Sequence, residues 1–112
     1  MSALMDIAVS ISRNMPKILL HLVVERQRQY RKWGRQKHSN ETWQTIALEE
    51  FGEIAKAMLE NKTKRPSEEI IQTAAVLIAW AEDIDERGEF PSEEYGGFND
   101  EAQKAAKEAK SS

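Results

Sequence analysis

The chain has 112 residues, which is about the size of one domain. Its content of 40% apolar and 31% charged residues is typical of a folded globular protein, and the absence of cysteine excludes disulfides, thiol nucleophiles and zinc sites built on thiolates. A formal net charge of -3 argues against wholesale nucleic-acid binding and against polybasic attachment to membranes. No stretch has the roughly 20 apolar residues of a membrane span, and the first residues lack the pattern of a secretory signal, so we expect a cytoplasmic protein.

The spacing of apolar residues predicts helices throughout and no strand. The expected helices cover residues 3–13, 17–34, 41–61 and 66–87. Pro16 can open the second of them, and Gly34 and Gly88 are expected stops because glycine adopts the backbone conformation that ends a helix. Ser39 or Asn40 can cap the third helix. The chain is therefore expected to be all-α.

The two ends of the chain are expected to be peripheral to the fold. Residues 90–99 contain two glycines and a proline and predict a loop. Residues 100–110 favour helix but offer only alanines for burial, which predicts a frayed or loosely docked helix. We expect one domain over residues 1–112, an antiparallel four-helix bundle with its core at residues 17–88. Its peripheral parts are residues 1–15 and 89–112.

The fourth expected helix is apolar around nearly its whole circumference. Its apolar positions are Ile70, Ile71, Ala74, Ala75, Val76, Leu77, Ile78, Ala79, Trp80, Ala81 and Ile84. A few short companions from one small chain can hardly cover such a helix, which favours self-association as a homo-oligomer. The alternative is a central helix wrapped entirely by its own chain.

Three glutamates stand on or beside the apolar stripe of the third expected helix. Glu50 falls inside the stripe, Glu53 lies at its edge and Glu49 faces further toward solvent. A buried carboxylate is costly unless something pairs with it. Gly52, in mid-helix, costs a further 1 kcal/mol or so relative to alanine, a local violation that a close approach of backbone or ligand would explain.

Glu69 and Gln72 share one face at the start of the fourth expected helix. The short connection at residues 62–65 favours antiparallel packing, which would bring them toward Glu50 and Glu53. Three carboxylates and an amide oxygen are hard ligands that suit Mg²⁺ or Mn²⁺. The alternative is that these glutamates are solvated or paired with lysine and arginine, as most helical glutamates are.

Residues 26–40 combine basic and aromatic side chains and contain no acid. The basic residues are Arg26, Arg28, Arg31, Lys32, Arg35 and Lys37. Tyr30, Trp33 and His38 lie among them, and Trp43 follows. Such a segment can bind a phosphate tail and stack a base, or follow a nucleic-acid backbone. A solvated basic helix face is the alternative.

Two segments resemble a known family. The sequence LEEFGEIAKAM at residues 48–58 and EEIIQTAAVLIAW at residues 68–80 resemble the MazG-like all-α nucleoside triphosphate pyrophosphohydrolases, whose signature is EExxE followed by ExxD. Residues 25–38 are similar to the stretch before the acidic motif in small members of that family. The resemblance covers roughly residues 20–85 and implies dimers or tetramers with the acidic helices at their centre.

The resemblance implies roles for the acidic residues. Glu50 and Glu53 match the first metal-binding pair, Glu69 matches the third ligand, and Glu49 matches the accompanying acid. Gln72 stands where the family usually has aspartate, so the fourth metal ligand would be a neutral amide oxygen. Glu49 or Glu53 would activate the attacking water.

The implied reaction is Mg²⁺-dependent hydrolysis of a nucleoside triphosphate to a nucleoside monophosphate and pyrophosphate. Lys32 and Arg35 would face the phosphates, with Trp33, His38 or Trp43 near the base. Two alternatives remain: a catalytically weakened relative that binds nucleotide or only dimerises, with the amide at position 72 marking the loss, and a helical protein that associates with nucleic acid through residues 26–37.

Overall fold

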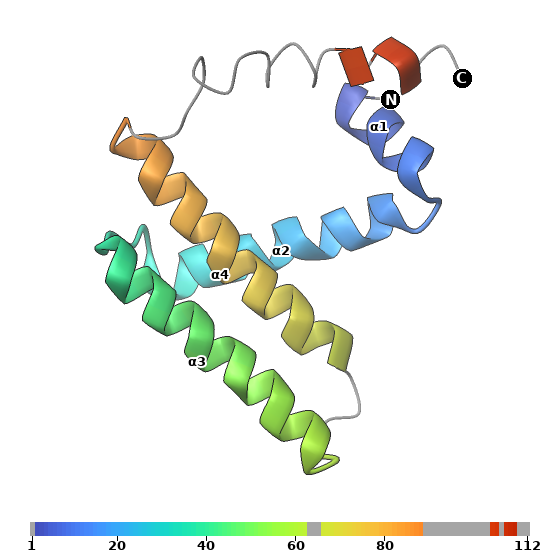
Figure 1. Ribbon diagram of the computed structural model, residues 1–112. Helices are drawn as coiled ribbons and strands as arrows, with labels where there is room; N and C mark the ends of the chain where they lie inside the picture. The colour runs from blue at the N-terminus through green and yellow to red at the C-terminus, as the bar shows by residue number, and fades with distance from the viewer. Residues whose placement is uncertain (1, 63–65, 89–103, 106, 110–112) are drawn as a thin grey trace. The chain divides into compact units, whose positions relative to one another are not determined.

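The computed structural model describes residues 2–62, 66–88, 104, 105 and 107–109. These residues form helices and turns with no strand, which confirms the all-α class. The helices are α1 (Ala3–Ile11), α2 (Met15–Trp33), α3 (Asn40–Leu59) and α4 (Pro66–Glu86), drawn in Figure 1. The expected loop at residues 90–99 lies outside the described residues, and so does most of the tail at 100–110. The described part of that tail, 104, 105 and 107–109, is helical.

The chain separates into two compact units. One comprises Met1–Leu20 with Phe90–Ser112, and the other comprises His21–Glu89. The expected functional residues all belong to the second unit. None of the described helices is both long and apolar enough to cross a membrane.

In the first unit, serines bound the short helix α1. The hydroxyl of Ser2 accepts a hydrogen bond from the Met5 amide at 3.3 Å. Ser12 has extended backbone angles and donates its amide to the Ala8 carbonyl at 3.2 Å, so the helix ends two residues before the predicted end at residue 13. Ala8 is buried, whereas Leu4 and Ile11 are exposed.

In the second unit, most predicted helix ends are confirmed. Gly34 and Gly88 have φ of 69° and 74°, the left-handed conformation that glycine adopts without strain. The Ser39 hydroxyl accepts from the Thr42 amide at 3.2 Å and caps α3. The predicted end of this helix at residue 61 is two residues too late, since Asn61 has φ of 54° and the Lys62 amide bonds back to the Ala57 carbonyl at 2.9 Å.

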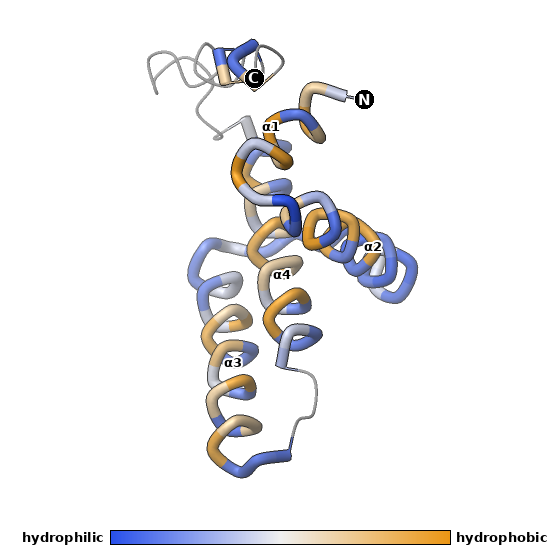
Figure 2. The backbone as a smooth tube through the Cα atoms, turned by 90° about the vertical axis from the view of Figure 1, so that its right-hand side faces the viewer, coloured by the Kyte–Doolittle hydropathy of each residue, from blue (hydrophilic) through white to orange (hydrophobic). Residues whose placement is uncertain are grey.

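Helices α3 and α4 run antiparallel and pack against each other (Figures 1 and 2). Trp43 of α3 and Ala75 of α4 are the buried apolar residues of this pair. The packing of α3 against α4 agrees with the short connection between them. The four-helix bundle itself stays a prediction.

The face of α3 that points away from this pairing is also apolar. Leu48, Phe51 and Leu59 lie at helical spacing on it and are 65%, 67% and 87% exposed. Gly52 lies on the same side, and a Cβ atom built there would meet no atom within 4 Å. No backbone of the same chain approaches Gly52, so the expected close contact is absent within the described part of one chain.

Candidate functional site

A hollow of about 220 Å³ lies in the second unit between α2, α3, α4 and residues 34–36. Four of the residues expected at the site contribute to its wall: Trp33, Arg35, Trp43 and Glu50. They come from three different segments of the chain, so the fold gathers aromatic, basic and acidic groups around one space.

The buried carboxylate of Asp83 holds Trp43, one of the residues that line this hollow. Its Oδ2 atom accepts a hydrogen bond from Trp43 Nε1 at 2.8 Å and another from the His38 backbone amide at 3.0 Å. These two bonds, that of Trp43 foremost, lower the pKa of Asp83 because they stabilise the charged form. Both Asp83 and Trp43 are only 2% exposed. Asp83 therefore joins α4 to α3 and to the segment before it.

The hydrogen bonds of Asp83 hold Trp43 and His38 in place. The Trp43 indole, which lines the hollow, is buried and donates its N–H to Asp83. The His38 ring packs edge-on against it, with ring centroids 4.9 Å apart, and His38 Nε2 lies 3.2 Å from Gln36 Oε1. Sequence reasoning missed Asp83. Its spacing from Ala75 and Ala79 on one helix face was the available signal.

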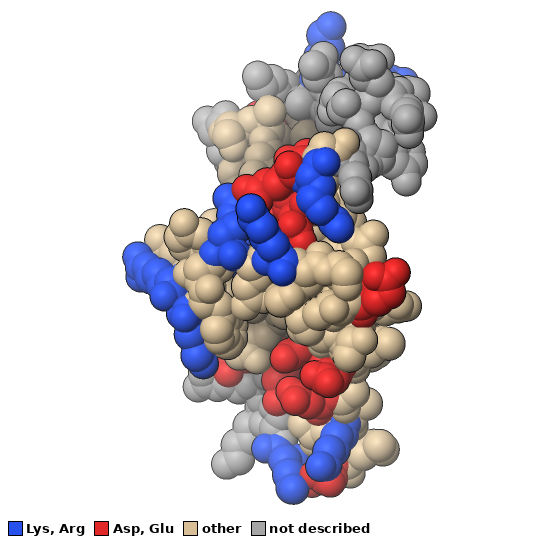
Figure 3. Space-filling view, turned by 90° about the vertical axis from the view of Figure 1, so that its left-hand side faces the viewer, with Lys and Arg blue, Asp and Glu red and all other residues tan. Residues whose placement is uncertain are grey.

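Half of the basic residues of segment 26–37 are already paired with carboxylates. Arg26 binds Glu82 through two nitrogens at 2.6 and 3.2 Å, and Arg35 binds Glu86 at 2.8 Å. Arg28 forms a similar pair with a glutamate on its own helix. Figure 3 shows acidic and basic side chains lying next to one another on one face of the molecule. This neutralisation weakens the nucleic-acid interpretation.

Trp33 and Lys32 form an exposed pair at the end of α2. Lys32 Nζ lies 4.8 Å from the centre of the Trp33 ring, within the range of a cation–π contact. Trp33 is 53% exposed and also lines the hollow. Of the three tryptophans, Trp33 thus combines exposure with a place on the hollow's wall, while Trp43 is buried.

The exposures of the acidic residues of α3 agree with the helical pattern for Glu50 and Glu49, while Glu53, expected at the edge of the apolar stripe, is exposed. Glu50 is half-buried, whereas Glu49 and Glu53 are exposed. Burial raises the pKa of Glu50, and the neighbouring negative charges of Glu53 and Glu49 raise it further. No lysine or arginine among the described residues forms an ion pair with any of the three. Ion pairs to these three glutamates are thus absent among the described residues, whereas the exposure of Glu49 and Glu53 agrees with the alternative that they are solvated.

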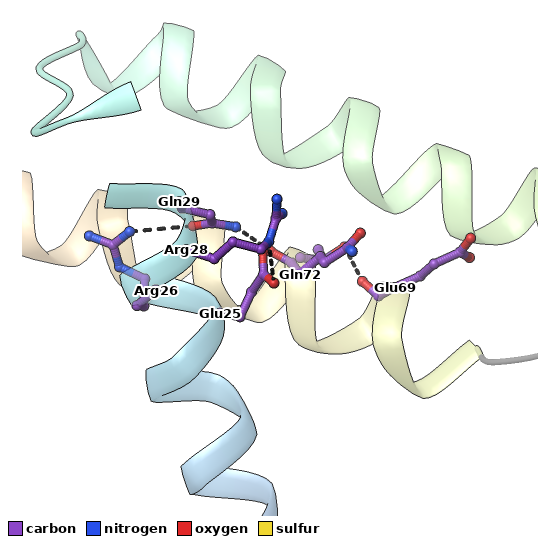
Figure 4. A network of polar contacts seen from close by, with 7 residues as sticks. Glu25, Arg26, Arg28, Gln29, Glu69 and Gln72 are labelled. Carbon is purple, nitrogen blue, oxygen red and sulfur yellow. Dashed lines mark hydrogen bonds and ion pairs between the residues drawn. The ribbon is translucent and has the colours of Figure 1, made fainter. Parts of the chain in front are cut away.

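Glu69 and Gln72 lie on the first turns of α4 and are both half-buried. Glu69 Oε2 is buried and has no hydrogen-bond partner among the described residues. Figure 4 shows the Glu69 side chain extending from α4 toward α3. The backbone carbonyl of Gln72 accepts a hydrogen bond from Gln29 Nε2 at 3.3 Å, which links α2 to this part of α4.

The structure does not bring the expected metal ligands together as one group. Among residues 2–62, 66–88 and the described tail, no three acidic, histidine or cysteine side chains lie close enough to hold a metal ion. The donor types nevertheless fit Mg²⁺, because they are carboxylate and amide oxygens, and the buried Glu69 Oε2 has no hydrogen-bond partner in the part of the chain that the structure describes. The metal site stays a prediction.

No protein-family model, curated protein or solved structure matches the chain. The resemblance to the MazG-like enzymes therefore rests on the two acidic motifs and the stretch at residues 25–38 alone.

Proposed function

We propose that the protein is a Mg²⁺-dependent hydrolase that converts a nucleoside triphosphate to a nucleoside monophosphate and pyrophosphate, in the manner of the MazG-like enzymes. One observation carries the proposal. The carboxylate of Glu50, with two acidic neighbours and no basic partner among the described residues, stands at the wall of a hollow that is also lined by Trp33 and Arg35. An unneutralised acidic cluster beside groups that suit a nucleotide is better explained by a cation and a ligand than by packing alone.

Glu50, Glu53, Glu69 and Gln72 are the residues that would hold the cation. When bound, Mg²⁺ neutralises phosphate charge and acts as a Lewis acid. The pKa of Glu50 is raised first by burial and then by the negative charges of Glu53 and Glu49, and a bound cation would offset that repulsion. Because Gln72 contributes no charge, the set has one carboxylate fewer than the family pattern.

The other residues of the site would bind and orient the nucleotide and accept a proton from the attacking water. Glu49 and Glu53 are exposed carboxylates that can accept the proton of an attacking water. Trp33 offers an aromatic face beside the hollow, and Lys32 and Arg35 supply positive charge for the phosphates. Trp43, fixed by its buried hydrogen bond, maintains the wall of the site.

Pyrophosphate release from a panel of ribo- and deoxyribonucleoside triphosphates tests this proposal. With Mg²⁺ we expect release of pyrophosphate and monophosphate in equal amounts, and we expect removal of the metal by a chelator to abolish it. Release of inorganic phosphate in place of pyrophosphate, or no hydrolysis of any triphosphate, would contradict the proposal. Nucleotide binding without hydrolysis would support the weakened relative, which the amide at Gln72 favours.

We also propose that the exposed apolar face of α3 packs against a second copy of the chain, as a dimer or tetramer. Leu48, Phe51 and Leu59 expose apolar surface on one continuous side of the helix. Gly52 and Ala55, small residues on that side, permit close approach of another helix. Removing this surface from water is the main stabilisation expected of such an interface.

Phe51→Glu should shift the protein toward the monomer. A charge at the centre of the apolar face must be buried for the copies to associate, so we expect the dissociation constant to rise by about 100-fold or more. Analytical ultracentrifugation over a range of concentrations measures this. Val23→Glu places the same charge at an equally exposed apolar site on α2 and should leave the mass unchanged. A monomeric wild-type protein would refute self-association.

A further inference from the structure

Two guanidinium groups converge on one carboxylate at the wall of the hollow. Glu82 Oε2 lies 2.6 Å from Arg26 Nη2 and 3.9 Å from Arg35 Nη1, and Glu82 Oε1 accepts from Arg26 Nε at 3.2 Å. All three residues line the hollow. Two arginines around one pair of oxygens is also the arrangement by which proteins hold phosphate groups.

The Arg26 side chain is positioned by more than its carboxylate partner. Its Nη1 donates to Gln29 Oε1 at 3.3 Å, and Gln29 is itself buried and bonded to the Gln72 carbonyl (Figure 4). The Arg26 side chain is only 17% exposed. The guanidinium therefore keeps a partner and a fixed direction even when Glu82 is not bound to it.

Glu82 is the less constrained side of this contact. Its side chain is 37% exposed, and the hydrogen bonds that the structure assigns to its carboxylate come from arginine. Solvent on the exposed side of Glu82 screens this ion pair and allows another anion to compete for the arginines. The buried bonds of the adjacent Asp83 already join α4 to α3, so exchange of the Glu82 contact costs the fold little.

We propose that Arg26 and Arg35 form an anion site in the hollow, which Glu82 fills in the free protein and a phosphate group of the ligand takes by displacing it. The identification of the ligand as a phosphate compound rests on the proposed function, whereas the anion site does not. Glu82 then acts as a built-in competitor that lowers affinity for the phosphate tail. Arg26, which the sequence pattern did not single out from its basic neighbours, becomes a binding residue.

Binding of inorganic pyrophosphate without metal, measured by titration calorimetry, tests this. Glu82→Gln removes the competing charge with little change of shape, so we expect it to bind pyrophosphate about 10-fold more tightly than wild type. Glu25→Gln is the matched control, because it makes the same change of net charge and frees Arg28, whose pair with Glu25 lies outside the hollow. It should change affinity by less than about 2-fold.

Adding Arg26→Gln to the Glu82→Gln variant should abolish the gain. An equal gain in Glu25→Gln, a gain that survives loss of Arg26, or no gain at all would overturn the proposal. The unmodified protein gives a second readout in case the variants unfold: pyrophosphate should move the NMR signal of the Arg26 Nε–H group and leave that of Arg28 in place. The reverse pattern would refute the site. Because no hydrolysis is measured, an inactive protein can still confirm it.

Discussion

Replacing Asp83 with alanine should lower the free energy of unfolding by about 2–4 kcal/mol. The substitution leaves two donors without their acceptor, the Trp43 Nε1–H group and the His38 backbone amide. Trp43 is buried, so its donor cannot turn to water. Denaturant unfolding followed by far-ultraviolet circular dichroism measures the loss.

Asp83→Asn is the matched control. Its side-chain oxygen can still accept both hydrogen bonds, so it should cost clearly less than alanine; equal losses in the two variants would contradict the role assigned to these bonds. The pH dependence gives a second check. The pKa of Asp83 in the folded protein is lowered from the ordinary value of 3.8. The contribution of Asp83 to the free energy of unfolding is therefore complete above pH 3.8 and is lost as the pH falls through the lowered pKa. Asp83→Asn should reduce this acid sensitivity.

Glu50→Gln should slow pyrophosphate release from the triphosphate by about 100-fold or more. The amide keeps the size of the side chain but removes the charge that the proposed cation requires. Because burial and two acidic neighbours raise the pKa of Glu50, this neutral form should fold at least as stably as wild type. The loss would therefore be one of function. Initial rates at several Mg²⁺ concentrations measure it.

Glu60→Gln is the control for this experiment. Glu60 lies just past the end of α3 and pairs with Lys62, away from the hollow, so its replacement should change the rate by less than about 2-fold.

Gln72→Asp should act in the opposite direction to Glu50→Gln and lower the Mg²⁺ concentration needed for half-maximal rate, because it adds a carboxylate to the set. An unchanged rate in Glu50→Gln would rule out its proposed role.

The sequence was sufficient to predict features that depend on neighbouring residues. Helical spacing placed Glu50 toward the packed side of α3 and Glu49 toward water, and both exposures agree with the structure. Gly34 and Gly88 ended helices as expected, since the left-handed conformation is a local property of glycine. The left-handed Asn61, which ends α3 early, shows where such local reasoning fails, because asparagine adopts this conformation less regularly.

Features that join distant segments could not be predicted in this way. The pattern indicated that Trp43 lies on an apolar face, but not that its indole donates to Asp83, which is 40 residues away. The contact between Arg26 and Glu82 spans 56 residues. Periodicity assigns a side chain to a face of its helix. The residue on another helix that this side chain contacts depends on how the two helices cross. The role near a base that was expected for Trp43 stays a prediction, whereas the burial of its ring is a result of how the helices pack.

The positions of the three tryptophans make their intrinsic fluorescence specific to one of the two compact units. Trp33, Trp43 and Trp80 all lie within His21–Glu89, and the other compact unit has none. Trp43 is buried and Trp33 exposed, while Trp80 donates to Asn40 Oδ1 at 3.0 Å, so their emission reports on loss of structure in the unit that holds the hollow. Fluorescence excited at tryptophan therefore follows one unit, whereas circular dichroism follows helices in both. Superimposable melting curves from the two signals would mean that the units unfold as one cooperative system.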